Sequence, residues 1–420
     1  MEETTKQKFR LTGLERAWIL YDVGNSAFVL LVATLIPIFF NALAAEGGLS
    51  SVEYLAYWGY AASAVTVITA ILSPILGTLA DTRNFKKPIF ILCLVVGVAG
   101  CCAMGLAKTW LPFLLIFVFA KVGFSGSLVF YDSMLSDVTT PERMDEVSAR
   151  GYAWGYIGSC IPFVVCLALV LGAGSIGISQ LTALNIALFI TAAWWLVTTL
   201  PLLGQYRQLH YVEVERHAIR QSFARIGHTI RHLHEDRQVF WFLLAFFCYI
   251  DGVYTIIDMA TAYGTALGLD TTGLLLALLL TQVVAFPSAL VFGRLSTNHP
   301  STQLIPVCIA AYAGIALFAF FLTQQWQFWV LAVAVGMFQG GVQALSRSHF
   351  AKIIPPEKSG EYFGLFDICG KGASFLGTMI VSVGSQLTGS ANVGVGSLIV
   401  LFVIGFVLFR VSTRTGKITG

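Results

Sequence analysis

The sequence predicts an all-α membrane protein with twelve transmembrane helices in two pseudo-symmetric halves of six, and with both termini in the cytoplasm. Hydrophobic residues make up 57% of the chain and charged residues only 11%, against roughly 25% charged in a soluble domain. Twelve apolar segments are long enough to cross a bilayer, and the basic residues gather on one side of them. A net charge of +3 over 420 residues, without a basic patch that has interleaved aromatics, argues against nucleic-acid binding.

Each of the twelve segments holds about the 20 residues that a helix needs to cross the hydrocarbon core of a membrane. Their expected bounds are 17–44, 54–80, 88–107, 110–136, 150–172, 179–203, 239–268, 271–295, 303–323, 326–350, 360–387 and 391–411. The longest connection, 204–238, separates an N-terminal bundle, 17–203, from a C-terminal bundle, 239–411. Short cytoplasmic segments, 1–16 and 412–420, flank the two bundles.

Lys and Arg indicate the orientation, because cytoplasmic loops of membrane proteins are enriched in them. Of the 25 basic residues, 22 lie in the N-terminus, the even-numbered connections, the C-terminus or their rims. Lys108 lies in an outer connection, and Lys121 and Lys371 lie inside spans. This one-sided distribution supports the twelve-span layout, because a single missed span would place the basic residues on both sides of the membrane.

The connection 204–238 is predicted to form an amphipathic helix along the cytoplasmic face. Its apolar residues recur at helical spacing, at Ile219, Phe223, Ile226, Ile230 and Leu233. His228 and His232 have the i, i+4 spacing that a metal could use. A solvated basic face is favoured because no thiolate or fixed carboxylate partner accompanies the pair, and we expect neither a metal nor a cofactor.

The first span carries Asp22 and Asn25 within an apolar run from Ala17 to Phe40. A carboxylate inside a membrane costs roughly 2.5 to 3.5 kcal/mol on insertion scales, so it usually faces protein or water rather than lipid. A cleaved signal peptide is disfavoured, because the run is longer than the apolar core of a signal and contains Asp22. We therefore expect this span to face a polar interior.

The two halves of the sequence contain similar motifs at corresponding positions. Gly77 to Asp81 closes the second span, and the similar stretch from Gly293 to Ser296 closes the eighth, 216 positions later. Thr140 to Arg143 and Pro355 to Lys358 follow the fourth and tenth spans, 215 positions apart. A duplication of six spans around a long central connection resembles the major facilitator transporters, whose substrate site lies near the membrane midplane between the halves.

The loop after the second span also resembles the signature loop of that superfamily, in which Gly and Asp precede a run of basic residues. The matching residues are Gly77, Asp81, Lys86 and Lys87, and the departures are Thr82, Asn84 and Phe85. Because the departures replace an expected Arg, Gly and basic residue, we expect altered gating contacts at this loop.

Further motifs resemble a narrower family, the autophagy-linked vacuolar amino-acid effluxers of fungi and their bacterial relatives. The most specific are the stretches Arg16 to Phe28 and Gln339 to Arg347; the others are Phe130-Tyr131 with Asp137, Asp251 to Val253, and Phe363-Gly364 with Gly370-Lys371. The resemblance implies a permease, with amino-acid export known for the fungal members. For a bacterial relative it implies a multi-pass protein of the inner, or plasma, membrane.

Seven ionisable residues lie inside the predicted spans, where charge is a functional hypothesis by default. They are Asp22, Lys121, Asp132, Asp251, Asp258, Asp367 and Lys371. By the resemblance, spans 1, 4, 7 and 10 line the central cavity, and they supply the substrate-binding candidates Asn25, Lys121, Asp251, Thr255, Gln339 and Gln343. Lys121 and Asp251 would suit the carboxylate and ammonium of a zwitterion.

Five intramembrane Asp against two Lys suggest proton coupling, for which the candidates are Asp251, Asp258, Asp367 and Lys371. Asp367 and Lys371 are also spaced for an ion pair within one helix, and this structural role is equally favoured. Gating is assigned to Asp22, Asp81, Asp132 and Arg347. Asp22 and Asp132 could instead brace the helix ends, and Arg347 is expected at the membrane rim.

The predicted function is secondary active transport of a small polar solute by alternating access, with amino acids as candidate substrates, proton coupling and a monomeric protein. The alternative is a transporter-like sensor or partner-binding membrane protein without net transport. An enzyme is not expected, because the sequence has no phosphate-binding loop and no constellation of nucleophile and base.

Overall fold

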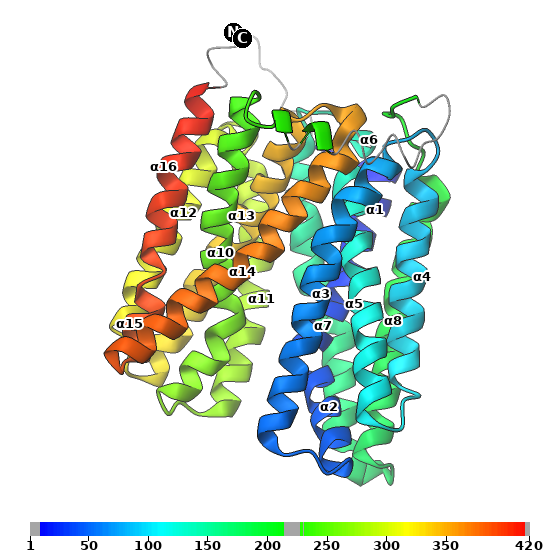
Figure 1. Cartoon of the computed structure of the whole chain (residues 1–420), viewed down its shortest axis with the longest axis vertical. Helices are drawn as coiled ribbons and strands as arrows, with labels where there is room; N and C mark the ends of the chain where they lie inside the picture. Colours follow the sequence, from blue (N-terminus) through cyan, green and yellow to red (C-terminus); the bar gives the residue numbers. More distant parts are fainter. Residues whose placement is uncertain (1–8, 214–226, 230, 416–420) are drawn as a thin grey trace.

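A computed structural model describes residues 9–213, 227–229 and 231–415, apart from the side chains of 51, 52, 55, 261, 262, 265, 266, 271, 272, 275 and 371–375. The described chain is helical, and its N-terminal and C-terminal halves stand side by side (Figure 1). The predicted amphipathic helix with Ile219, Phe223, Ile226 and Ile230 falls largely outside the described residues.

The N-terminal half, blue to green in Figure 1, contains nine helical elements. They are α1 (Gly13–Ala33), α2 (Leu35–Glu46), α3 (Ser51–Ala80), α4 (Lys86–Met104), α5 (Trp110–Ser133), α6 (Leu135–Val138), α7 (Met144–Gly172), η1 (Ala173–Ile176) and α8 (Gln180–Gln205). The C-terminal half, green to red, contains α10 (Arg237–Ala266), α11 (Thr271–Leu295), α12 (Ser301–Phe320), α13 (Gln325–Ile353), η2 (Pro356–Lys358), α14 (Ser359–Thr388), α15 (Ala391–Gly396) and α16 (Ile399–Thr415).

Eleven segments of the described chain are long and apolar enough to span a membrane. The predicted segment 360–387 is not among them, although it coincides with the 30-residue helix α14. Three other predicted spans, 17–44, 110–136 and 391–411, each contain a break between two helices. The first breaks at Thr34, between α1 and α2, because Pro37 provides no N–H for the carbonyl of Ala33 and its ring crowds that carbonyl.

Several helices begin where a polar side chain satisfies the free N–H groups of the first turn. At α1 the hydroxyl of Thr12 accepts from the Glu15 N–H at 3.1 Å, and the Glu15 carboxylate accepts from the Thr12 N–H at 2.7 Å. The same reciprocal arrangement joins Ser50 and Glu53 at α3. These capping residues lie in the loops, so they define the residue at which each of these two helices begins.

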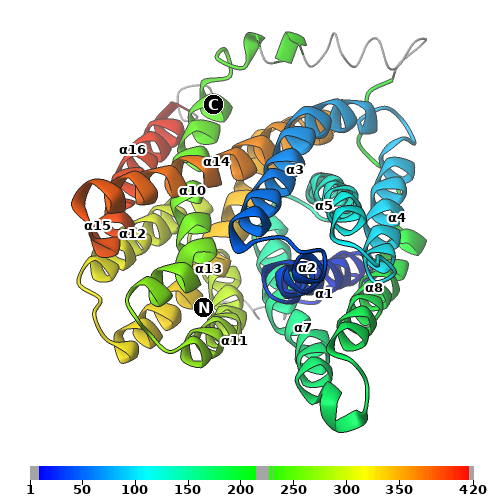
Figure 2. The same cartoon turned by 60° about the horizontal axis from the view of Figure 1, so that its bottom comes forward.

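The two halves contact one another mainly at the end where α1 and α10 begin and where α8 and α16 end, at the top of Figure 1. We call this the linker end. The principal contacts between halves are α3 with α14 and α7 with both α11 and α13. At the opposite end, α2 packs chiefly on α1, α5 and α8, and α15 packs chiefly on α12 and α14, each within its own half (Figure 2).

Glycines at equivalent positions of the sequence repeat permit this close approach. A Cβ atom on Gly77, at the end of α3, would lie 2.2 Å from the carbonyl oxygen of Gly360 in α14. A Cβ atom on Gly293, at the end of α11, would lie 2.8 Å from the Cβ of Ala149 in α7. The repeated motif therefore marks the two places where the halves touch at the linker end.

Candidate functional site

Arg347 of α13 lies at the centre of the contact between the halves. Its Nη1 donates to Asp132 Oδ1 of α5 at 2.9 Å, and its Nη2 lies 3.7 Å from Asp22 Oδ2 of α1. Its Nε donates to the hydroxyl of Ser148 in α7 at 2.9 Å, and Nη2 also donates to the Ser148 carbonyl at 3.1 Å. The side chain is 2% exposed. Three helices of the other half, α1, α5 and α7, therefore enclose the guanidinium at the linker end, and its expected place at the membrane rim stays a prediction.

Aromatic rings complete the enclosure of this cation. The guanidinium carbon lies 4.3 Å from the ring centroid of Tyr152, 4.6 Å from that of Trp18 and 5.3 Å from that of Tyr131. Trp18 and Tyr131 stack with centroids 4.3 Å apart, and the indole N–H donates to the Tyr131 carbonyl at 2.9 Å. Rings that exclude water strengthen both the cation–π contacts and the ion pairs.

Asp22 and Asn25 lie together on α1, one turn apart. Asn25 Nδ2 donates to Asp22 Oδ1 at 3.5 Å, and both side chains are buried. Within the described residues, Asp22 Oδ2 accepts no hydrogen bond. Asp22 and Asp132 thus share one arginine of the opposite half.

A second contact between the halves joins the α3–α4 loop to the start of α14. Asp81 Oδ1 accepts from the Gly360 N–H at 2.7 Å, and Asp81 Oδ2 accepts from the Glu361 N–H at 2.8 Å. Free N–H groups at a helix N-terminus favour a carboxylate in this position. Lys86 Nζ lies 3.7 Å from Asp81 Oδ1 and donates to the Ser359 hydroxyl at 2.7 Å, so the loop is tied to α14 twice.

Asn84 explains how this loop keeps its shape although it departs from the signature. It stands where the signature has Gly, and its φ of 63° is in the left-handed region. Asn is one of the few side chains that tolerate this conformation. The replacement therefore preserves the turn that brings Asp81 and Lys86 to α14.

Sequence reasoning missed a third contact, between the start of α7 and the end of α13. Asp145 Oδ1 accepts from the Ser348 hydroxyl at 2.6 Å, and Lys352 Nζ lies 2.7 Å from Asp145 Oδ2. The Ser148 hydroxyl donates to the Ala344 carbonyl at 2.8 Å. Asp145 and Ser148 lie between the repeated stretch Thr140 to Arg143 and the predicted fifth span, and the neighbouring repeat was the available signal.

Lys121 lies at the middle of α5. Lys121 Nζ lies 4.8 Å from the centroid of the Phe124 ring. Its charge acts on Asp258 across the two halves, and Asp258 is exposed although it belongs to a membrane-spanning helix. Between this pair and Arg347, the Gln343 side-chain oxygen accepts from the Tyr156 hydroxyl at 3.1 Å, and Gln339 is buried one turn away.

Asp251 and Thr255 do not face the other half, contrary to the expectation that they line the cavity. Asp251 Oδ1 accepts from the Gly377 N–H of α14 at 2.9 Å and from the Thr255 hydroxyl at 3.3 Å. Both side chains are fully buried inside the C-terminal half. Asp258, about one turn beyond Thr255 on α10, is exposed.

Asp367 joins the halves instead of acting only within its own helix. The Ser73 hydroxyl of α3 donates to Asp367 Oδ2 at 2.8 Å. Lys371 lies outside the described side chains, so its predicted pairing with Asp367 stays a prediction.

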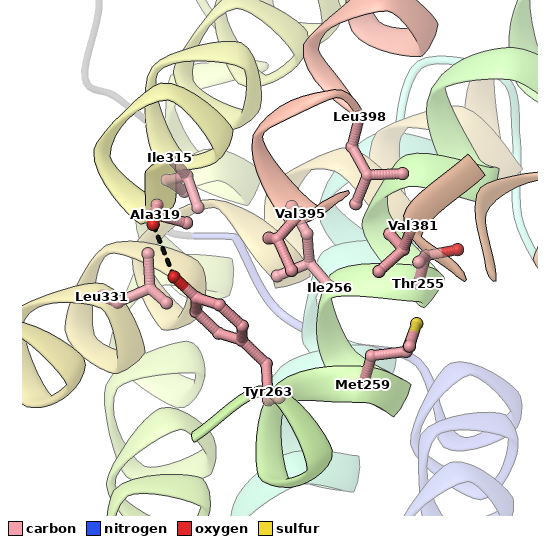
Figure 3. A pocket seen from close by; sticks show the side chains of 11 residues that line it. Thr255, Ile256, Met259, Tyr263, Ile315, Ala319, Leu331, Val381, Val395 and Leu398 are labelled. Atoms are coloured by element: carbon pink, nitrogen blue, oxygen red, sulfur yellow. Dashed lines mark hydrogen bonds between the residues drawn. The ribbon is translucent and has the colours of Figure 1, made fainter. Parts of the chain in front are cut away.

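A pocket inside the C-terminal half is apolar and unsuited to a polar solute (Figure 3). Its lining consists of Thr255, Ile256, Met259, Ala260, Tyr263, Ile315, Ala319, Leu331, Val381, Val395 and Leu398. The one hydroxyl group drawn pointing across it, that of Tyr263, donates to the Ala319 carbonyl at 2.6 Å. The polar residues between the halves are therefore the better candidates for a solute site.

Known proteins resemble this chain along nearly its whole length. The family model for Atg22-like vacuole effluxers matches residues 14–419. The MFS-type transporter YxiO of Bacillus subtilis (strain 168) is 43% identical over 404 residues, which are 95% of this chain and 94% of that protein. Autophagy-related protein 22 of Coccidioides immitis (strain RS) is 26% identical over 64% of this chain, which spans about half (51%) of that protein.

Solved structures show the same fold. The major facilitator superfamily transporter FucP in its outward conformation has a TM-score of 0.73 at 15% identity, over 95% of this chain and 97% of that chain. A bacterial homologue of the iron transporter ferroportin in an outward-facing state has a TM-score of 0.69 at 17% identity, over 96% and 98% of the two chains.

The apolar helices, the duplicated halves and these relatives describe a multi-pass membrane transporter and not an enzyme. The chain belongs to the Atg22-like vacuole effluxer family of the major facilitator superfamily.

Proposed function

We propose that this protein is a secondary active transporter of a small polar solute, working by alternating access in the inner membrane of a bacterium. The observation that carries the proposal is the placement of the charged contacts. Arg347 with Asp132, Asp81 with the start of α14, and Asp145 with Lys352 all join the halves at the linker end. The excess of basic residues at this end supports a cytoplasmic location, and with that orientation these contacts would close the protein to the cytoplasm.

The solute site is proposed to lie between Lys121 and Asp258. A zwitterion such as an amino acid offers a carboxylate to Lys121 and an ammonium to Asp258, which belong to opposite halves and interact electrostatically. Gln339 and Gln343 of α13, and Asn25 of α1, lie toward the linker end of this pair and supply amide groups for hydrogen bonds. The family name, vacuole effluxer, supports export but names no substrate.

Proton coupling is proposed to involve Asp258 and Asp367, because the charge of Lys121 acts on the first and the Ser73 hydroxyl donates to the second from the opposite half, so that their surroundings change when the halves separate. Asp251, the first candidate from the sequence, is enclosed by α14. A transport assay with Asp251→Asn separates the two possibilities, since a variant that keeps its full response to a pH gradient excludes Asp251 as the coupling site.

Counterflow tests the proposed function. Purified protein is reconstituted into vesicles loaded with a mixture of unlabelled amino acids, and uptake of the labelled mixture is followed with and without a pH gradient. We expect exchange by the wild type, strong loss in Lys121→Gln and no change in Lys108→Gln, whose side chain is exposed in an outer connection. Binding of an amino acid without exchange would identify a sensor and overturn the proposal.

A further inference from the structure

The first residues of the central connection lie against the α3–α4 loop, and we call the contact of Asp81 in this loop with the start of α14 the gate. We call residues 206–213 the strap. The Val212 N–H donates to the Asp81 carbonyl at 2.8 Å, and Thr82 forms a parallel β-bridge with Val212. Gln208 Nε2 donates to the Ala80 carbonyl at 3.1 Å. The strap is therefore bonded to the same loop that carries Asp81 to the other half.

Asp137 of α6 anchors the strap. This carboxylate is 3% exposed and accepts four hydrogen bonds from the strap. Their donors are the Tyr206 hydroxyl at 2.6 Å, the Leu209 N–H at 3.2 Å, and both the N–H and the imidazole Nδ1 of His210 at 2.9 Å. Such a group of donors holds the carboxylate ionised beside the imidazole.

Lys86 connects Asp137 to the gate. Its ammonium is fully buried, 3.9 Å from Asp137 Oδ2 and 3.7 Å from Asp81 Oδ1, while it donates to Ser359 of the other half. Two buried carboxylates thus share one ammonium. A protonated His210 compensates the negative charge of Asp137, whereas a neutral His210 leaves that charge to be compensated by Lys86.

Charged groups from several elements face His210. Asp137 of α6, Lys86 of α4 and Glu357 of η2 act on it directly. Beyond them lie Asp81, the buried Glu361 of α14, and an exposed ion pair of Arg83 with the strap residue Glu213 at 3.4 Å. Among the groups that act directly on His210, the two carboxylates of Asp137 and Glu357 outnumber the single ammonium of Lys86, so a proton on His210 balances the cluster.

We propose that His210 is a positioning residue that makes closure of the linker end sensitive to protons. When His210 is protonated it compensates Asp137, and Lys86 stays on Asp81 and Ser359. When His210 is neutral, Asp137 draws Lys86 away from Ser359 and the contact with α14 weakens. The inference rests on alternating access by this protein, and it adds control of linker-end closure by the pH on that side.

The sign of the pH dependence of closure follows from the groups around the imidazole of His210. The hydrogen bond to Asp137 raises the pKa of His210 above its ordinary value of 6.5, and the charge of Glu357 raises it further. Glu357 belongs to the C-terminal half and departs when the halves separate, so the pKa is higher in the closed state. Protonation therefore stabilises closure fully below about pH 6.5, and this stabilisation disappears as the pH rises through the raised pKa.

Distance measurements between two nitroxide labels test the inference without a substrate. The labels are placed on Thr140→Cys and Asn298→Cys, exposed residues of the two halves at the linker end, after replacement of the eight natural cysteines. The full-length protein is studied in lipid nanodiscs from pH 5.5 to 8.5. We expect the ratio of closed to open populations to fall by about threefold across this range, the effect of one half-exposed charge interaction.

Three variants make the result decisive. His210→Gln should remove the pH dependence and lower the closed population at acid pH, whereas His210→Arg should hold the high closed population at every pH. His299→Gln, an exposed histidine at the same end, should keep the wild-type profile. An unchanged profile in His210→Gln, or a closed population that rises with pH, would overturn the inference. Failure of counterflow alone would refute transport and leave this result standing.

Discussion

Replacing Arg347 with Gln should open the linker end. The substitution removes a 2.9 Å ion pair with Asp132, a 3.7 Å contact with Asp22 and two hydrogen bonds to Ser148, and it leaves two carboxylates without their cation. Breaking a buried ion pair from one side costs about 3 to 5 kcal/mol. Since these bonds join the two halves, the cost falls on the closed state, and 3 kcal/mol corresponds to about a 150-fold change in the closed-to-open ratio.

The label pair at Thr140 and Asn298 measures this change directly. We expect the long distance to dominate in Arg347→Gln, and the wild-type distribution to persist in Arg294→Gln, an exposed arginine of the same half. Adding Asp132→Asn to Arg347→Gln removes one of the orphaned charges and should recover part of the closed population. An Arg347→Gln protein that folds and keeps the wild-type distance distribution would refute the reasoning.

Three further predictions follow from the same contacts. Gly77→Ala should prevent full closure, because its Cβ would lie 2.2 Å from a backbone oxygen, whereas Gly314→Ala has open space and should leave the label distances unchanged. Asp81→Asn should weaken two hydrogen bonds to the start of α14, lower the closed population by about tenfold and reduce thermal stability in nanodiscs. Exchange of the charges in Lys121→Asp with Asp258→Lys should restore part of the amino-acid counterflow that either single variant loses, and a double variant as inactive as both would argue against direct pairing.

Much of the fold could be predicted from the sequence, because membrane spans are specified by local composition. Apolar length and the one-sided basic residues predicted the two halves, and eleven of the twelve segments recur as candidate spans. The repeat at Gly77 and Gly293 pointed to positions that touch the opposite half. The break at Thr34 was missed because hydropathy alone does not register the effect of Pro37 on the helix.

The partners of the charged residues could not be predicted in the same way. Asp132 and Arg347 are 215 positions apart, and neither has a local feature that identifies the other. Asp251 and Asp258 share a side of α10, so helical spacing alone could not tell that α14 covers the first and leaves the second exposed. These pairings are decided by the contact between the two halves, and that contact depends on how whole helices pack.

Alternating access is the central claim, and paired distance measurements at both ends of the protein test it most directly. The linker-end labels are combined, in separate samples, with labels on Glu46→Cys and Gln386→Cys, exposed residues of the two halves at the opposite end. We expect reciprocal populations, so that Arg347→Gln lengthens the linker-end distance and shortens the opposite-end distance relative to wild type. Opposite-end distances that stay unchanged while the linker end opens would contradict alternating access.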